Sequence, residues 1–382
     1  MSGKVKNIFW VAGENSGDLH ASIVIKALNK RGSNYRHLGI GGHRMQAQGF
    51  TPMFPFQKFS IMGFLEVLQS LPFIWHVEKE IKKFFAKIKP DLVVLVDYPG
   101  FNLRLARIAY DLDIPVLYFI CPQFWAWRHG RVKQLKENTN FVASILPFEK
   151  ESLDIHRVTS AYVGHPIAEE IQIEVGREQF ANTFGLDPDK DWLGFMPGSR
   201  DSEIRKMLPP FIEAIRRFRT DEFQFLVSKA HTINHEMFMS YFPDKLLKRI
   251  FLIDGYMYEM IKYSRFMVVT SGTATLETAY IGTPFIIVYK SSWVSYSIAR
   301  RLVRIKRIGL PNIILDNDIV PELIQDEVTG ENIYTRILQY LDNSQEYDKM
   351  AAELGMIKEL LSEKKASQEV ASIIESIINE EK

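Results

Sequence analysis

The stretch Phe266-Met-Val-Val-Thr-Ser-Gly-Thr-Ala-Thr-Leu-Glu277 decides the fold of the second half of the chain. Its apolar start predicts a buried strand, Ser271, Gly272 and Thr273 predict a turn, and the residues up to Glu277 begin a helix. A helix behind such a turn presents unpaired N–H groups and a positive dipole end, which suit a phosphate or diphosphate. Glu277 would then accept hydrogen bonds from a sugar hydroxyl. An ordinary turn with Ser as N-cap is the alternative interpretation.

The composition is that of a soluble globular protein with more than one core. The chain has 382 residues, of which 46% are hydrophobic and 24% charged, and this length favours two domains. A net charge of +1 argues against a nucleic-acid partner. The single cysteine, Cys121, excludes an internal disulfide and a cysteine-based zinc site, suits a reducing cytosol, and is expected to be a buried small hydrophobe.

No segment reads as a signal peptide or a membrane span. The chain runs directly into the strand expected at 5–12, without a charged region, long apolar core and cleavage site. The longest uncharged apolar stretch, 114–127, is too short to cross a bilayer and contains Pro115 and Pro122. Contact with a membrane surface remains open.

Strand-like and helix-like segments alternate along the chain, which predicts two Rossmann-like, doubly wound α/β domains. Many of the strand-like runs are continuously apolar, as in parallel strands buried on both faces. The domains are expected at 1–166 and 167–343, with the crossover after Pro166, and the helical tail 344–382 could pack on the N-terminal domain or mediate dimerisation. Strands are expected at 7–12, 37–40, 92–96, 116–120, 141–146, 161–163, 192–196, 223–227, 250–253, 266–270 and 285–289.

Loops at the carboxyl ends of these strands are the expected ligand sites. The first strand runs into Ala12-Gly-Glu-Asn-Ser-Gly-Asp18, where Glu14, Ser16 and Asp18 would face the crevice unless the stretch is a plain N-cap turn. This is not the G-x-G-x-x-G of dinucleotide binders, so we discount an NAD enzyme.

The strand 92–96 ends at Asp97, before a Pro-Gly turn, and an acid there is a candidate general base. The alternative is that Asp97 only binds backbone N–H groups of the turn. Asn102 is expected to cap the following helix, whether or not it also touches substrate.

The stretch after the next strand, Cys121-Pro-Gln-Phe-Trp-Ala-Trp-Arg128, is rich in aromatic residues. Trp125 and Trp127 could form a platform for a sugar ring, or they could be core aromatics.

Polar groups also follow strands of the second half. Arg200, in Pro197-Gly-Ser-Arg200, could bind a phosphate with its guanidinium fork, or it could pair with Glu203 or Asp201. Asn312 and the stretch Pro321-Glu-Leu-Ile-Gln325 supply amides and a carboxylate near the same crevice.

No metal site is expected. Asp111-Leu-Asp113 and Asp316-Asn-Asp318 read as solvated turns, and the nine histidines show no ligand spacing.

Several of these stretches, in order over residues 12–325, resemble the lipid-A-disaccharide synthases, a family of bacterial glycosyltransferases. The tail beyond Gln325 carries no such motif, and Gly100 stands where the family usually has an acid. Phe195-Met196 replace a Leu-Leu that the family tends to have, which looks like a core swap. The resemblance is carried by 12–18, 39–42, 97–102, 122–128, 146–149, 163–166, 197–200, 271–277, 310–312 and 321–325.

The resemblance implies a GT-B architecture, two Rossmann-like domains facing each other across a cleft. It implies transfer of 2,3-diacylglucosamine from its UDP ester to the 6-hydroxyl of 2,3-diacylglucosamine 1-phosphate, with inversion and release of UDP. It also implies action at the inner face of the cytoplasmic membrane without a metal or other cofactor.

The candidate residues fit that chemistry. Asp97 would be the base, and Arg200 with the N–H groups of Ser271, Gly272 and Thr273 would hold the diphosphate. The ribose would bind Glu277, and Asn312 and Glu203 would lie on the nucleotide-sugar side. The acceptor side would hold Glu14, Ser16, Asp18, Asn102, Trp125 and Trp127.

Two segments could meet acyl chains or lipid headgroups. Residues 53–75 are aromatic and amphipathic, and 300–307 contain five basic residues in eight. A core helix and a solvated basic helix face are the alternatives.

Two rival functions remain open on the sequence. One is another GT-B enzyme of UDP-N-acetylglucosamine, such as a 2-epimerase or a peptidoglycan transferase. The other is a non-catalytic carrier of a nucleotide sugar or lipid.

Overall fold

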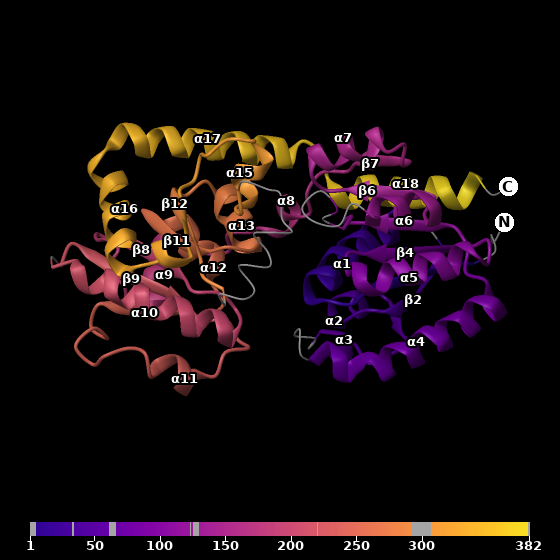
Figure 1. Ribbon diagram of the computed structural model, residues 1–382, viewed down its shortest axis with the longest axis horizontal. Coiled ribbons are helices and arrows are strands. Elements are labelled where there is room, and N and C mark those ends of the chain that lie inside the picture. The colour runs from indigo at the N-terminus through magenta and orange to yellow at the C-terminus, as the bar shows by residue number, and fades with distance from the viewer. Residues whose placement is uncertain are drawn as a thin grey trace. The chain divides into compact units, whose positions relative to one another are not determined.

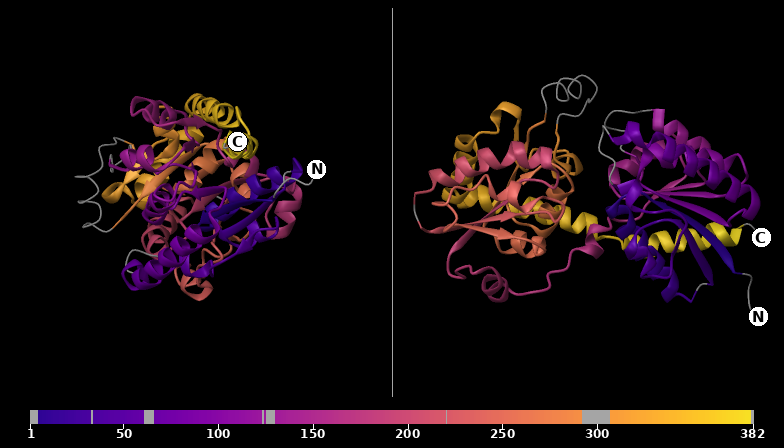
Figure 2. Two further views of the ribbon diagram at one scale, coloured as in Figure 1. Left: turned by 90° about the vertical axis from the view of Figure 1, so that its right-hand side faces the viewer. Right: turned by 90° about the horizontal axis from the view of Figure 1, so that it is seen from below.

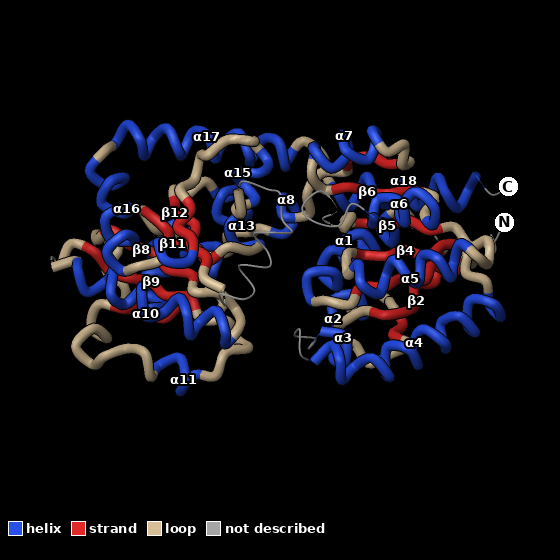
Figure 3. The backbone as a smooth tube through the Cα atoms, in the orientation of Figure 1, coloured by secondary structure: helices blue, strands red, loops and turns tan. Residues whose placement is uncertain are grey.

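The computed structural model describes residues 5–32, 34–60, 66–122, 124, 130–219, 221–291 and 307–380. The chain forms two compact units: unit 1 comprises Met1–Pro166 and Glu363–Lys382, and unit 2 comprises Ile167–Ser362. Each unit contains one sheet with helices on both faces, and every described strand pair is parallel (Figures 1 and 3). The expected α/β class, with two doubly wound parallel sheets, is therefore confirmed.

Unit 1 holds a seven-stranded sheet in the order β3-β2-β1-β4-β5-β6-β7. Its strands are β1 (Lys6–Ala12), β2 (Tyr35–Ile40), β3 (Thr51–Pro52), β4 (Leu92–Val96), β5 (Val116–Phe119), β6 (Phe141–Ser144) and β7 (Ser160–Tyr162). Its helices are α1 (Asn15–Lys30), α2 (His43–Gln46), α3 (Gln57–Ser60), α4 (Glu66–Ile88), α5 (Pro99–Tyr110), α6 (Gly130–Asn138), α7 (Pro147–Ile155) and α18 (Ala366–Glu380).

Unit 2 holds a six-stranded sheet in the order β10-β9-β8-β11-β12-β13. Its strands are β8 (Asp191–Met196), β9 (Phe223–Ser228), β10 (Ile250–Ile253), β11 (Phe266–Thr270), β12 (Phe285–Tyr289) and β13 (Glu322–Ile324). Its helices are α8 (Ile167–Glu170), α9 (Arg177–Phe184), α10 (Asp201–Arg217), α11 (His235–Met239), α12 (Met257–Tyr263), α13 (Thr273–Ile281), α15 (Leu310–Ile314), η1 (Gln325–Glu327), α16 (Gly330–Asp342) and α17 (Ser344–Ser362).

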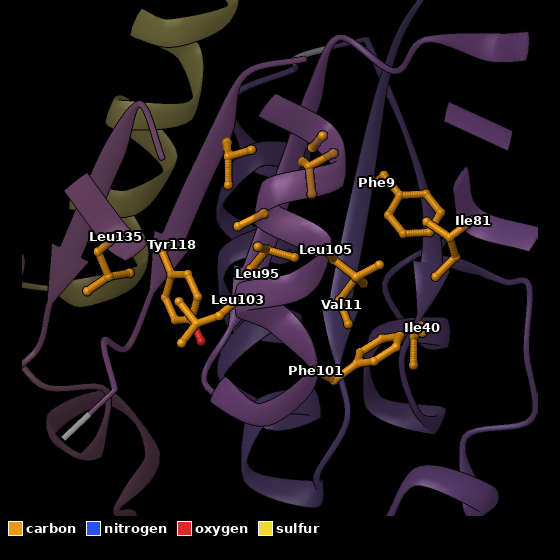
Figure 4. Packing of buried hydrophobic residues seen from close by; sticks show 14 of the residues in the cluster. Phe9, Val11, Ile40, Ile81, Leu95, Phe101, Leu103, Leu105, Tyr118 and Leu135 are labelled. Atoms are coloured by element: carbon orange, nitrogen blue, oxygen red, sulfur yellow. The ribbon is translucent and has the colours of Figure 1, made fainter. Parts of the chain in front are cut away.

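The core of unit 1 explains its continuously apolar strands. All five residues of β4 are buried, because helices cover both faces of the sheet. On one face, Phe9 and Val11 of β1 pack with Ile81 of α4 and Phe101 of α5 (Figure 4). The helices α1 and α18 lie together and supply the cover from the other side.

Both sheets reverse their strand order at one point, between β1 and β4 in unit 1 and between β8 and β11 in unit 2. In doubly wound folds the two loops at such a point diverge to opposite faces and leave a crevice in which ligands bind. The register brings the carboxyl ends of these strands level, since Ala12 pairs with Val96 and Met196 with Val269. The strand order therefore selects two pairs of loops as candidate sites.

The stretch 344–382 forms two helices that belong to different units, whereas the sequence suggested a single tail. Helix α17 packs against α13 in unit 2, while α18 packs against α1 in unit 1, and Figure 2 shows α18 lying along the first sheet. Arg31, at the end of α1, donates hydrogen bonds to Ser372 Oγ (3.1 Å), Glu375 Oε2 (2.8 Å) and the Gln368 carbonyl (2.9 Å). The end of the chain is thus part of the first core.

Shortening a buried side chain of α18 should destabilise unit 1. Ile374 is fully buried, so Ile374→Ala should lower the free energy of unfolding by about 2–5 kcal/mol, as measured by urea denaturation. Glu369→Ala, at an exposed position of the same helix, is the control and should change stability little. Equal stability of the two variants would show that α18 contributes nothing to the first core.

Candidate active site

The loop after β4 places Asp97 at the switch point of unit 1 in an unusual backbone conformation. Asp97 and Tyr98 both have positive φ, 46° and 48°, which costs energy for non-glycine residues. The turn is held by Asn102, whose Nδ2 donates to the carbonyls of Asp97 (2.7 Å) and Val96 (3.1 Å). The Tyr118 hydroxyl donates to the same Asp97 carbonyl at 2.8 Å. Three hydrogen bonds from two side chains therefore fix the backbone that carries the Asp97 carboxyl.

The helix after Asp97 begins at Pro99, with Tyr98 as its N-cap, so the expectation that Asn102 caps it is wrong. Asn102 lies one turn inside α5 and is fully buried. Its side-chain amide donates hydrogen bonds to carbonyls at the ends of β1 and β4, including Val11 O at 3.5 Å. Pro99 could start the helix because the first N–H groups of a helix need no intrahelical acceptor.

The electrostatics of this turn suit a general base. Burial and, after it, the nearby Glu14 carboxylate together raise the pKa of Asp97 to about 6, against the opposing effects of His20 and Arg131. An acid with a pKa near the working pH can be ionised and still accept a proton effectively in a reaction. Burial and Glu14 likewise raise the pKa of Tyr98.

Of the three polar residues predicted to face the crevice after β1, two are exposed to solvent and the third is buried. Glu14 and Ser16 are exposed at the start of α1. Asp18 is buried, and its carboxylate accepts hydrogen bonds from the N–H groups of Gly42 (2.7 Å) and Met45 (3.2 Å) at the start of α2. Asp18 therefore caps a helix from a distance in sequence.

The loop after β5 is described only in part. Cys121 is buried, as expected from the sequence, and burial together with Glu149 raises the pKa of its thiol. Trp125 and Trp127 lie outside the described residues. Behind the same edge of the sheet, burial lowers the pKa of His165 to about 3, so that this imidazole is neutral at physiological pH.

In unit 2 the strand, turn and helix start expected over 266–277 are found as β11, the corner Ser271–Gly272 and α13, which runs on to Ile281. The Ser271 N–H donates to the Val288 carbonyl of β12 at 2.9 Å, which anchors the corner to the sheet. A Cβ on Gly272 would meet no described atom within 4 Å, so the backbone there can be approached closely. Within the described part of the chain, no protein acceptor is found for the N–H groups of Gly272 and Thr273. The corner is therefore available to an anion.

The adjacent strand β8 brings Arg200 to the same switch point. The Arg200 side chain is 80% exposed and its Nη1 lies 3.2 Å from Glu203 Oε1. Glu203 also accepts hydrogen bonds from the N–H groups of Ser199 (2.9 Å) and Arg200 (3.2 Å). The ion pair considered as an alternative thus exists, but such an exposed pair is weak and leaves the guanidinium accessible to a ligand.

Glu277 lies in the second turn of α13, half-buried. Burial, opposed by a hydrogen bond from the Tyr258 hydroxyl (3.3 Å) and aided by the Glu170 carboxylate, raises its pKa to about 7. Tyr258, from α12, is a neighbour of the site that the sequence did not reveal, because no local pattern links it to Glu277.

Asn312 is buried and satisfied by its own unit. Its Nδ2 donates to the Val320 carbonyl and to Glu322 Oε1, both at 2.8 Å, and its Oδ1 accepts from the Val320 N–H. Glu322 accepts from the N–H groups of Ile308 and Gly309 as well, each at 2.9 Å. This Asn312–Glu322 clamp fixes the chain around β13.

Two further properties follow for the described residues. They contain no group of three or more His, Cys, Asp or Glu side chains arranged to hold a metal ion. None of their helices is both long and apolar enough to cross a membrane. Asp316 and Asp318 are exposed and both bind the Arg307 guanidinium, so this D-x-D pair belongs to a surface turn.

Two doubly wound parallel-sheet domains in one chain define a GT-B architecture. The fold resembles a UDP-N-acetylglucosamine 2-epimerase from Listeria monocytogenes, with a TM-score of 0.67, 14% identity and coverage of 99% of this chain and 97% of that one. It also resembles the glycotransferase of kitacinnamycin, with a TM-score of 0.68, 9% identity and coverage of 98% and 100%.

The sequence comparisons narrow the class to one family. The model of the lipid-A-disaccharide synthetase family matches residues 8–377. The lipid-A-disaccharide synthase of Trichlorobacter lovleyi is 34% identical over 380 residues, which cover 99% of both chains. The chain therefore belongs to the lipid-A-disaccharide synthetase family, and it is a glycosyltransferase.

The raised pKa of Asp97 carries a stability prediction. A carboxyl whose folded pKa is about 6, against an ordinary 3.8, stabilises the fold only while protonated, so this contribution is lost as the pH rises from 4 to above 6. Asp97→Asn should therefore raise the free energy of unfolding by about 1–3 kcal/mol at pH 8 and by almost nothing at pH 3.5. Urea denaturation at the two pH values tests this, and a difference independent of pH would contradict it.

Proposed function

We propose that the chain transfers 2,3-diacylglucosamine from its UDP ester to the 6-hydroxyl of 2,3-diacylglucosamine 1-phosphate. The products are the β-1,6-linked disaccharide 1-phosphate and UDP. Family membership supports this reaction, and the observation that carries the mechanism is the half-buried Asp97 carboxyl at the switch point of unit 1, with its pKa raised to about 6.

On the acceptor side, Asp97 removes the proton of the attacking hydroxyl. The exposed Glu14 and Ser16 bind the acceptor sugar, and Trp125 and Trp127 add a stacking platform. Asn102 and Asp18 act indirectly, because their buried side chains shape the loops that carry Asp97 and the start of α2. The hydroxyl oxygen bonds to the anomeric carbon as the bond to UDP breaks, and inversion gives the β linkage.

On the donor side, the N–H groups of Gly272 and Thr273 receive the diphosphate, and Arg200 compensates the charge that develops on the leaving UDP. The N–H of Ser271, expected from the sequence to take part, is bonded to the Val288 carbonyl instead. Such preorganised donors stabilise a developing oxyanion, and one of them is typically worth about 2.7–4 kcal/mol. Glu277 binds the ribose hydroxyls. Glu203 and Asn312 hold the loops around this site, and no cofactor or metal takes part.

We also infer that the enzyme works at the inner face of the cytoplasmic membrane, where acylated substrates lie. The support is Trp75 on α4, 60% exposed within the amphipathic stretch 53–75, since indole rings favour the membrane interface. Most of the basic stretch 300–307 lies outside the described residues. A homodimer stays a proposal that follows only from the helical tail.

Replacing Asp97 should stop the chemistry and spare the nucleotide. With both acylated substrates, the wild-type chain should give the disaccharide 1-phosphate by mass spectrometry, also in the presence of EDTA, and no product from unacylated UDP-N-acetylglucosamine. Asp97→Ala should lower kcat by about 10²–10⁴-fold, as expected for loss of a general base.

Calorimetric titration should show that Asp97→Ala binds UDP as the wild type does. A large loss of UDP affinity would assign Asp97 to the nucleotide site, and loss of activity in EDTA would overturn the metal-free mechanism.

The affinity for UDP should depend on the ionisation of Glu277. Since its pKa is raised to about 7, the carboxylate that accepts both ribose hydroxyls forms as the pH rises through 7, and UDP should bind more tightly at pH 8 than at pH 6. Glu277→Gln should bind UDP about tenfold more weakly at pH 8, with little pH dependence. Thr278→Ser, at the next position of α13, is the control. An unchanged pH profile in Glu277→Gln would remove Glu277 from the site.

A further inference from the structure

A groove of about 1030 Å³ opens in unit 1 beside the turn that carries Asp97. Its walls are α5 and α6, with Glu78 of α4 on one side. Pro99 and Gly100, which directly follow the Asp97–Tyr98 turn, line its near end. The groove therefore begins at residues that closely follow the proposed base in the chain. None of the functions proposed above involves this groove.

Cations dominate this groove. Its lining contains four basic side chains and two carboxylates: Arg104 and Arg107 of α5, Arg131 and Lys133 of α6, and the acids Glu78 and Glu137. The excess of positive charge along two neighbouring helices is that of an anion site.

Two ion pairs within the groove are loose, whereas Arg107 Nε donates to Asp111 Oδ1, outside the lining, at 3.2 Å. Arg104 Nε lies 3.4 Å from Glu78 Oε2, and Lys133 Nζ lies 3.7 Å from Glu137 Oε1. These separations exceed those of good hydrogen bonds. Both Arg104 Nε and Glu78 Oε2 are buried and make no hydrogen bond within the described residues. A ligand that brings oxygen acceptors would satisfy the guanidinium, since Arg binds phosphate with its planar fork.

A helix start adds to the positive field at the near end. The first residues of α5, a helix of 12 residues with Tyr98 as its N-cap, line the groove. A Cβ on Gly100 or Gly130 would meet no described atom within 4 Å, so an anion can reach both backbones. The dipole of α5 and four cations thus act on the same space.

We propose that this groove binds the phosphomonoester of the acceptor sugar, an inference that rests on the proposed function. A phosphomonoester carries up to two negative charges and three acceptor oxygens, which match the paired guanidinium and ammonium groups. The groove is also coupled to the base, because the charge of Arg131 acts on Asp97 and that of Arg104 on Tyr98. Anchoring the phosphate here holds the acceptor close to Asp97.

The test compares the acceptor with and without its phosphate. Acceptor KM is measured for 2,3-diacylglucosamine 1-phosphate and for its dephosphorylated form, at saturating UDP-2,3-diacylglucosamine. The variants are Arg104→Gln and the double variant Arg107→Gln/Lys133→Gln. The side chains of Arg107 and Lys133 are 65% and 77% exposed, so their replacement should be tolerated. Lys136→Gln, exposed on α6 outside the groove, is the matched control.

If the groove binds the phosphate, replacing its cations and removing the phosphate from the acceptor should have non-additive effects on the acceptor KM. Each groove variant should raise KM for the phosphorylated acceptor about tenfold, leave KM for the dephosphorylated acceptor and for the donor unchanged, and so erase the preference for phosphate. Lys136→Gln should keep that preference. Equal losses with both acceptors, or no loss with either, would overturn the inference.

Two other outcomes are distinguishable. If the variants keep the preference for phosphate but no longer float with phosphatidylglycerol vesicles, the groove binds membrane lipid and the inference is wrong. If the wild-type chain joins neither acceptor to the donor sugar, the proposed function itself has failed.

Discussion

The amide of Asn102 is the interaction on which the first site depends. It donates to carbonyls at the ends of both β1 and β4, the two strands that part at the switch point. Without it the Asp97 carbonyl would keep only the hydrogen bond from the Tyr118 hydroxyl, and the left-handed turn at Asp97 and Tyr98 would lose a contact that offsets its strain. Asn102 Oδ1 is left without a hydrogen-bond partner among the described residues, a cost that is typical of a functional site rather than of a plain core.

The pKa values of the two candidate carboxyls, Asp97 and Glu277, are both raised, although the two groups have different proposed roles. Burial is the main cause of the raised pKa of both Asp97 and Glu277, and in each case a second carboxylate, Glu14 or Glu170, adds to it. For a base, a pKa near 6 means that protonation is favourable during the reaction while the free enzyme is still ionised at neutral pH. For a ribose acceptor, a pKa near 7 makes nucleotide binding sensitive to pH in the physiological range.

What could be predicted from the sequence was local. The corner at Ser271 and the acid at Asp97 each lie in a strand, a turn and a helix that follow one another directly. A sequence pattern of about a dozen residues therefore predicts each of them. The strands β3 and β13 were missed because they have two and three residues and no apolar run. The roles of Asp18 and Asn312 were also beyond reach, since their partners Gly42 and Val320 are set by tertiary contact. For the tail, the sequence left packing on the N-terminal domain and dimerisation as alternatives, because no pattern in it identifies α1 as the partner of α18.

The division of charge between the units follows from the chemistry. A base is effective only if no strong cation depresses its pKa, whereas a leaving diphosphate requires cations and N–H groups. Unit 1 keeps carboxylates at its switch point. Although four basic side chains line the groove beside it, the coulombic effects of His20 and Arg131 lower the pKa of Asp97 less than burial and Glu14 raise it. Unit 2 places an exposed arginine and an open helix start at the corresponding point of its own sheet. One doubly wound topology, used twice, thus supplies opposite electrostatic environments, because the loops at a switch point can change without disturbing the sheet that carries them.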